Sequence, residues 1–204
     1  MTEIEGVIKF NLTFQKEELV DIDVVELSKW RSKLKERGLL GQVQDRYEGY
    51  GFGNISQRTA GGFVISGTQT GVLESVTLSD YAVCESWDLK HNAINGRGTT
   101  KPSSESLSHA SIYDVHESAI CALHAHSPDI WSNSIRLGIA VTDESVPYGT
   151  PEMAKEVRRV IAEMSCPGIF SMGGHKDGVF TFGKSLEEAG SLMLGELARS
   201  KTLF

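Results

Sequence analysis

Two histidines separated by one residue end the segment 119–126, Ala-Ile-Cys-Ala-Leu-His-Ala-His, which has the composition of a strand. Because successive side chains of a strand point to opposite faces, His124 and His126 are expected on the same face of a sheet. A third imidazole, His175, lies in the glycine-rich segment 172–178. Three imidazoles that leave one coordination position open suit a catalytic zinc ion. The fold must therefore bring a central strand and a distant glycine-rich segment together.

Length and charge narrow the class of protein. The 204 residues fit one domain, and 27 acidic against 20 basic residues give a net charge of -7, which argues against a nucleic-acid partner. The three widely spaced cysteines predict neither a disulfide framework nor a cysteine-zinc site. No apolar run approaches the length of a membrane span, and no secretion signal is recognisable at the N-terminus. We expect a cytoplasmic protein without a membrane partner.

Helical and strand patterns alternate along the chain. Apolar residues at helical spacing predict a first helix over 23–38, and residues 6–14 are predicted to form a strand. Capping residues followed by proline or glutamate predict helix starts at Ser127, Thr150 and Ser185. Intermingled helices and strands favour one sheet covered by helices. We predict a single domain over 1–204, with residues 1–20 as an N-terminal strand extension.

Small polar residues gather at three places. Segments 50–58 and 62–71 are predicted to be two strands ending in small polar residues, whose backbone amides and hydroxyls could converge on an anion. Taken alone, these glycines are better explained by hairpin turns. In the segment 101–105, Ser104 is predicted to cap a helix whose first amides and serine hydroxyls suit a phosphate or carboxylate. Glu105 and the residues four and eight positions later share a helical face, which is either solvated or functional.

Several of these motifs together resemble the class II aldolase/adducin family in order and rough spacing. They are, in chain order, Gly53-Asn54-Ile55-Ser56, Ile65-Ser66-Gly67, Pro102-Ser103-Ser104-Glu105 with His109 and Tyr113, His124-Ala125-His126, Pro147-Tyr148-Gly149-Thr150, His175, and Ser185-Leu186-Glu187-Glu188-Ala189. The resemblance implies a three-layer α/β/α sandwich and a homotetramer with active sites near subunit contacts.

The resemblance also implies a site. His124, His126 and His175 correspond to the zinc ligands of the family, and Glu105 corresponds to its catalytic acid/base. Five residues lie where members with phosphorylated substrates hold the phosphate group: Asn54, Ser66, Gly67, Ser103 and Ser104.

The implied reaction is aldol or retro-aldol cleavage of a small hydroxy-carbonyl substrate through a metal-stabilised enediolate. A zinc-dependent dehydratase of the methylthioribulose-phosphate type or an epimerase remains an alternative on the same scaffold. A non-catalytic, adducin-like interaction domain is a further alternative.

Two departures from the family pattern matter for this choice. The segment after the H-x-H strand, 135–144, is shorter than in the sugar-phosphate aldolases and lacks their proton-donating tyrosine. Lys176 replaces the glycine that usually follows the third histidine. Tyr148 is either a substitute proton donor or a structural or interface residue, and the second interpretation is preferred.

Overall fold

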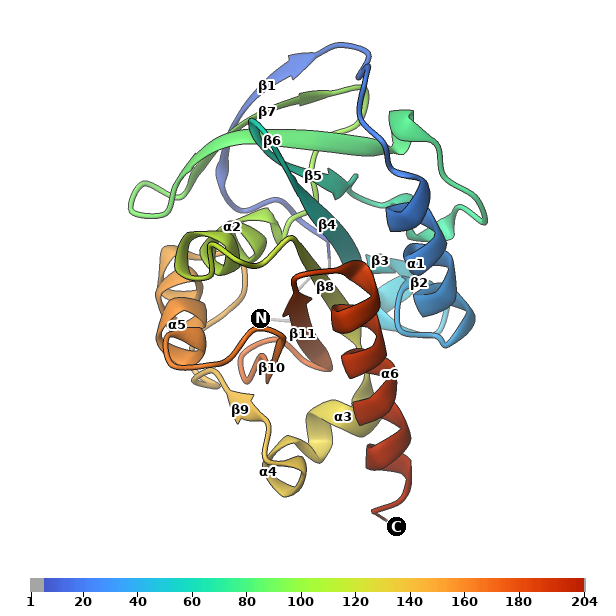
Figure 1. The fold of residues 1–204 in the computed structure, drawn as a ribbon, viewed down its shortest axis with the longest axis vertical. Helices are drawn as coiled ribbons and strands as arrows, with labels where there is room; N and C mark the ends of the chain where they lie inside the picture. Colours follow the sequence, from blue (N-terminus) through green and yellow to red (C-terminus); the bar gives the residue numbers. More distant parts are fainter. Residues whose placement is uncertain (1–5, 204) are drawn as a thin grey trace.

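A nine-stranded sheet forms the centre of the computed structural model, which describes residues 6–203 (Figure 1). The strand order is β1-β7-β6-β5-β4-β8-β11-β10-β9, and β2 and β3 pair separately. The strands are β1 (Asn11–Lys16), β2 (Gly41–Gln42), β3 (Gly51–Phe52), β4 (Asn54–Thr59), β5 (Gly62–Ser66), β6 (Tyr81–Asp88), β7 (Ala93–Gly98), β8 (Cys121–His126), β9 (Ala140–Val141), β10 (Gly168–Ser171) and β11 (Gly178–Gly183).

Helices cover both faces of this sheet, as the sequence predicted. They are α1 (Val25–Glu36), α2 (Ser106–Val115), α3 (Pro128–Ser132), α4 (Ser134–Leu137), α5 (Pro151–Ile161) and α6 (Leu186–Lys201). One apolar core lies beneath α1, α3, α4 and α6, and the other lies beneath α2 and α5 (Figure 1). The three-layer α/β/α arrangement is therefore confirmed. Among the described residues, no helix has the length and apolar character needed to cross a membrane.

Strand β8 occupies the middle of the sheet and pairs with antiparallel neighbours on both sides. Its register places His124 opposite Asn54 of β4, and His126 opposite Gly178 of β11. Every residue of β8 and β11 is buried, because helices cover both faces at this point. This burial explains why the apolar residues of β8 do not alternate with polar ones.

The three predicted helix starts are confirmed by their capping hydrogen bonds. The hydroxyl oxygens of Ser127, Thr150 and Ser185 accept hydrogen bonds from backbone amides in the first turns of α3, α5 and α6. Each bond satisfies one of the amides that a helix start leaves without an intrahelical partner. A cap needs only residues close in sequence, which is why local patterns found these boundaries.

Other predicted boundaries were wrong. Helix α2 begins after Glu105 rather than after Ser104, because the Ser103 hydroxyl accepts the Glu105 amide at 3.3 Å and tightens the preceding turn. The strand predicted over 50–58 is interrupted at Gly53, whose φ of +73° favours glycine. The strand predicted over 62–71 ends at Ser66, where the chain turns into the loop before β6.

The N-terminal strand is also displaced from its predicted position. Strand β1 pairs in parallel with β7 at the sheet edge, whereas the prediction covered residues 6–14. Residues 6–10 make other contacts instead of strand pairing: Lys9 donates to the Tyr148 carbonyl at 3.2 Å, and Thr68 donates to the Gly6 carbonyl at 3.3 Å. Residues 1–5, part of the predicted N-terminal extension, lie outside the described residues.

Two glycines of α6 give a matched test of the packing between α6 and α1. A Cβ at Gly190 would collide with the Trp30 ring, whereas a Cβ at Gly195 would meet nothing within 4 Å. We expect Gly190→Ala to lower the free energy of unfolding by about 1–3 kcal/mol through overpacking. Gly195→Ala should raise it by up to about 1 kcal/mol through helix propensity. Urea denaturation followed by circular dichroism measures both, and equal effects would contradict the packing.

Candidate metal centre

Three buried imidazoles converge at the end of β8. His124 and His126 point to the same face of the strand, and His175 comes from the turn between β10 and β11. The backbone of this turn is closed by a hydrogen bond from the Gly178 amide to the His175 carbonyl at 3.0 Å. One ring nitrogen from each histidine lies within 4.8 Å of the others, and the side chains are at most 2% exposed. The fold thus brings the three predicted ligands together.

The surroundings of His124 fit a metal ion. Its Nε2 atom is buried and has no hydrogen-bond partner among residues 6–203, which is costly unless another group binds there. A Cβ at Gly178 would lie 3.3 Å from this nitrogen, so glycine preserves the space beside it. Burial holds the pKa of His124 well below its usual range, and His126 and His175 lower that pKa further. A neutral imidazole is the form that binds a metal.

Aromatic rings fix the orientation of each histidine. Phe180 stacks on His124 with ring centroids 4.5 Å apart, and Tyr148 stacks on His175 at the same distance. Tyr47 contacts His126 edge-on at 4.6 Å. The Tyr148 ring is fully buried, and the Lys9 ammonium lies 3.5 Å from its centroid.

Tyr47 is a residue of the site that the sequence did not reveal. Its hydroxyl donates to Asp177 Oδ2 at 2.8 Å, which ties the loop before β3 to the turn that carries His175. Burial raises the pKa of the Tyr47 phenol, so this group stays protonated. No local signal marks Tyr47, because its contacts span 130 residues of sequence.

Glu105 reaches the imidazole group from the N-terminus of α2. Its side chain is 1% exposed, and Oε1 lies 3.4 Å from Nδ1 of His175. The other carboxylate oxygen, Oε2, accepts a hydrogen bond from the Ser108 hydroxyl at 2.8 Å. The positive end of the helix dipole favours a carboxylate at this position. The fold therefore places an acidic group directly beside the three histidines.

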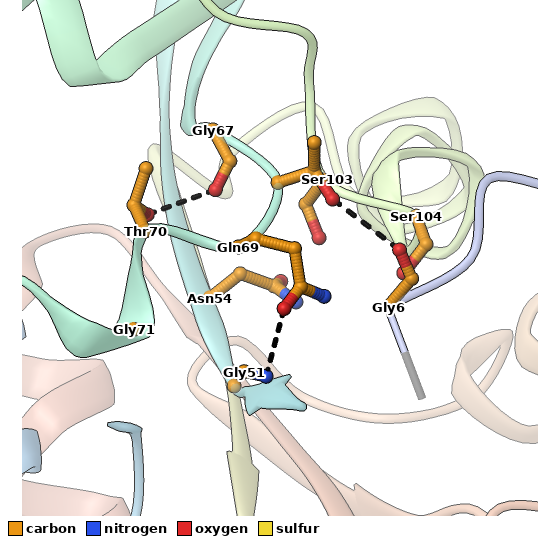
Figure 2. Close-up of a pocket in the computed structure, with 11 residues that line it drawn as sticks. Gly6, Gly51, Asn54, Gly67, Gln69, Thr70, Gly71, Ser103 and Ser104 are labelled. Carbon is orange, nitrogen blue, oxygen red and sulfur yellow. Dashed lines mark hydrogen bonds between the residues drawn. The ribbon is translucent and has the colours of Figure 1, made fainter. Parts of the chain in front are cut away.

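Figure 2 shows a small polar pocket lined by Asn54, which also contacts His124 at 3.3 Å. Four of the five predicted phosphate-binding residues line it: Asn54, Gly67, Ser103 and Ser104. Ser66 instead accepts the Ile55 amide at 3.1 Å and holds the hairpin between β4 and β5 together.

The side chain of Gln69, which the sequence did not single out, extends into this pocket (Figure 2). Its Oε1 accepts the Gly51 amide at 3.0 Å, and its Nε2 lies so close to Gly6 that a Cβ there would collide with it. The remaining cavity is about 20 Å³, enough for about one water molecule.

Comparison with known families gives one match over most of the chain. The family described as "Class II Aldolase and Adducin N-terminal domain" matches residues 42–195, from the end of β2 into α6. Comparison with curated protein sequences found no match.

Solved structures show the same fold. L-fuculose-1-phosphate aldolase from Thermus thermophilus is 21% identical with a TM-score of 0.62, covering 86% of this chain and 89% of that chain. YgbL from Escherichia coli, described as "a putative aldolase/epimerase/decarboxylase", is 20% identical with a TM-score of 0.63, covering 88% of this chain and 86% of that chain. A sugar-phosphate aldolase from Thermotoga maritima is 16% identical with a TM-score of 0.63, covering 87% of this chain and 91% of that chain.

The space beside His124 can be tested with one methyl group. We expect the Gly178→Ala protein, after purification and incubation with zinc, to contain less bound zinc than wild type, because the added Cβ crowds Nε2 of His124. Gly61→Ala is the matched control, since a Cβ at Gly61 meets nothing within 4 Å. Metal content by plasma mass spectrometry, alongside thermal melting, measures the effect. Full zinc occupancy in a folded Gly178→Ala protein would show that this space is not used.

Proposed function

Because the chain belongs to the class II aldolase and adducin family, we propose that it is a metal-dependent lyase acting on a small hydroxy-carbonyl molecule. The observation that carries this proposal is the Glu105 carboxylate 3.4 Å from His175 within a buried three-histidine group. A carboxylate and an electrophilic ion side by side are what proton transfer next to a carbonyl requires. An adducin-like binding module has no need of this pair.

In the proposed enzyme, His124, His126 and His175 hold a divalent ion, and imidazole-only ligation favours zinc. The bound ion would polarise the substrate carbonyl and favour negative charge on its oxygen. The rings supply nitrogen atoms in fixed orientations, because Phe180 packs against His124 and Tyr148 packs against His175. The three histidine side chains are at most 2% exposed, and electrostatic interactions are stronger at a buried site than in water.

Glu105 is proposed as the acid/base. The Ser108 hydroxyl holds Oε2, and Oε1 is the oxygen directed toward His175. In retro-aldol cleavage this oxygen would deliver a proton to the carbon next to the carbonyl, and in the reverse direction it would remove that proton. A fixed carboxylate beside a cationic centre suits both directions.

Dehydration on the same scaffold is the second candidate. Residues 135–144 form the end of α4 and strand β9 and contain no tyrosine that would protonate a departing aldehyde. Product analysis separates the two reactions, since retro-aldol cleavage yields two carbonyl fragments and dehydration yields a single carbonyl product and water.

We further propose a cytoplasmic homotetramer with the site near a subunit contact, in keeping with the family resemblance.

Replacing the acid/base tests the enzyme proposal. We expect Glu105→Gln to keep about one zinc per chain and to lower kcat by about 10²–10⁴-fold, because the amide cannot transfer the proton. The control is Glu163→Gln, on the exposed surface beyond α5. Steady-state rates over a panel of hydroxy-carbonyl compounds, with metal analysis of each sample, provide the measurement. Wild-type protein that takes up no metal would refute the proposal.

The polar pocket is proposed to hold the polar end of the substrate, and Gln69 is expected to control whether a phosphate group fits. A cavity of about 20 Å³ is too small for phosphate while the Gln69 side chain lies in it. We expect inorganic phosphate to bind Gln69→Ala at least about tenfold more tightly than wild type, an effect of about 1.4 kcal/mol.

Isothermal titration calorimetry with inorganic phosphate provides this measurement. Gln57→Ala, outside the pocket, is the matched control. Equal phosphate affinity in wild type and Gln69→Ala would show that the glutamine does not limit access.

A further inference from the structure

The Asn54 side chain links two buried imidazoles. Its amide nitrogen lies 3.3 Å from Nδ1 of His124, and its amide oxygen lies 2.6 Å from Nε2 of His109. The β4–β8 register places Asn54 directly opposite His124, while His109 reaches the same amide from α2. His109 lies one helical turn after Glu105 and packs edge-on against Phe180, the ring that stacks on His124.

The hydrogen-bond chain continues beyond His109. Its Nδ1 lies 2.6 Å from the Ser56 hydroxyl, and that hydroxyl lies 2.7 Å from the Tyr113 hydroxyl. All of these side chains are buried. Burial lowers the pKa of His109 to about 3, so the ring stays neutral and carries one proton. A neutral imidazole donates from one nitrogen and accepts at the other.

The position of the proton on His124 therefore determines the direction of every other hydrogen bond in this series. When the amide nitrogen of Asn54 faces His124, it donates to Nδ1, so the proton of the neutral His124 ring is on Nε2. A metal on Nε2 requires that proton to be on Nδ1, where it needs an acceptor. The amide must then turn by half a rotation and offer its oxygen to His124. Its nitrogen now donates to Nε2 of His109, whose own proton must lie on Nδ1 and point to Ser56.

We propose that Asn54, His109 and Ser56 form a two-position hydrogen-bond relay that sets the tautomer of His124 and so controls metal affinity. The relay rests on the proposed metal site. Both rings keep one proton in each position, so no net proton is gained or lost. His109 acts through Asn54 and is a positioning residue. Groups that orient a ligating histidine from behind commonly change metal affinity by about 10–100-fold.

Zinc affinity, measured by competition with a chromophoric chelator at pH 7, tests the relay. Ser56→Ala removes the acceptor that the metal-binding tautomer of His109 needs, and we expect about tenfold weaker binding. His109→Phe should weaken zinc binding by about 10–100-fold. His109→Gln should recover much of this loss, because its amide can turn either a donor or an acceptor toward Asn54.

Ser111→Ala is the matched control. Ser111 is a buried serine of α2 whose hydroxyl donates to the Leu107 carbonyl, outside the relay. The zinc affinity of the Ser111→Ala protein should therefore equal that of wild type.

Nitrogen NMR of the wild-type protein gives a second readout that needs no variant. Long-range ¹⁵N–¹H spectra should show the His109 proton moving from Nε2 to Nδ1 when zinc is added. If wild type binds zinc but His109 keeps one tautomer and Ser56→Ala binds as tightly, the relay is refuted and the metal site stands. If wild type binds no zinc, the proposed metal site fails and the relay fails with it.

Discussion

The pairing of β8 between β4 and β11 is the constraint on which the rest of the site depends. It sets Asn54 opposite His124 and Gly178 opposite His126, so β8 has a polar side chain beside it on one neighbouring strand and a glycine on the other. Because side chains alternate along a strand, a slip of one residue would turn both histidines to the opposite face. Caps at both ends of this region, from Ser127 and Ser185, help to fix where the strands stop.

The sequence predicted the parts of this arrangement that depend on near neighbours. The spacing of His124 and His126 placed them on one face, and the capping residues located three helix starts, because both rules act over a few residues. Glu105 and His175 were assigned through the family resemblance. The structure brings all four side chains together, although the helix of Glu105 begins one residue later than predicted.

The parts that the sequence could not reveal are contacts between distant segments. Tyr47 reaches Asp177 across 130 residues, and Gln69 enters a pocket with Gly6 and Ser104. Nothing in the local sequence separates such residues from ordinary loop residues, since their roles depend on which loops meet. The face of Glu105 and His109 could not be judged solvated or functional for the same reason. Its burial follows from the packing of α2 on the sheet.

Asn54 connects the two halves of the site, because the same side chain lines the polar pocket and contacts His124. An amide has one oxygen and one nitrogen, so its orientation cannot satisfy every neighbour independently. Any group that binds in the pocket and prefers one orientation must also change the free energy of the His124 tautomers. By thermodynamic reciprocity, an ion bound to His124 then changes the affinity of the pocket by the same factor. Metal and substrate affinity in this protein are therefore expected to be linked properties.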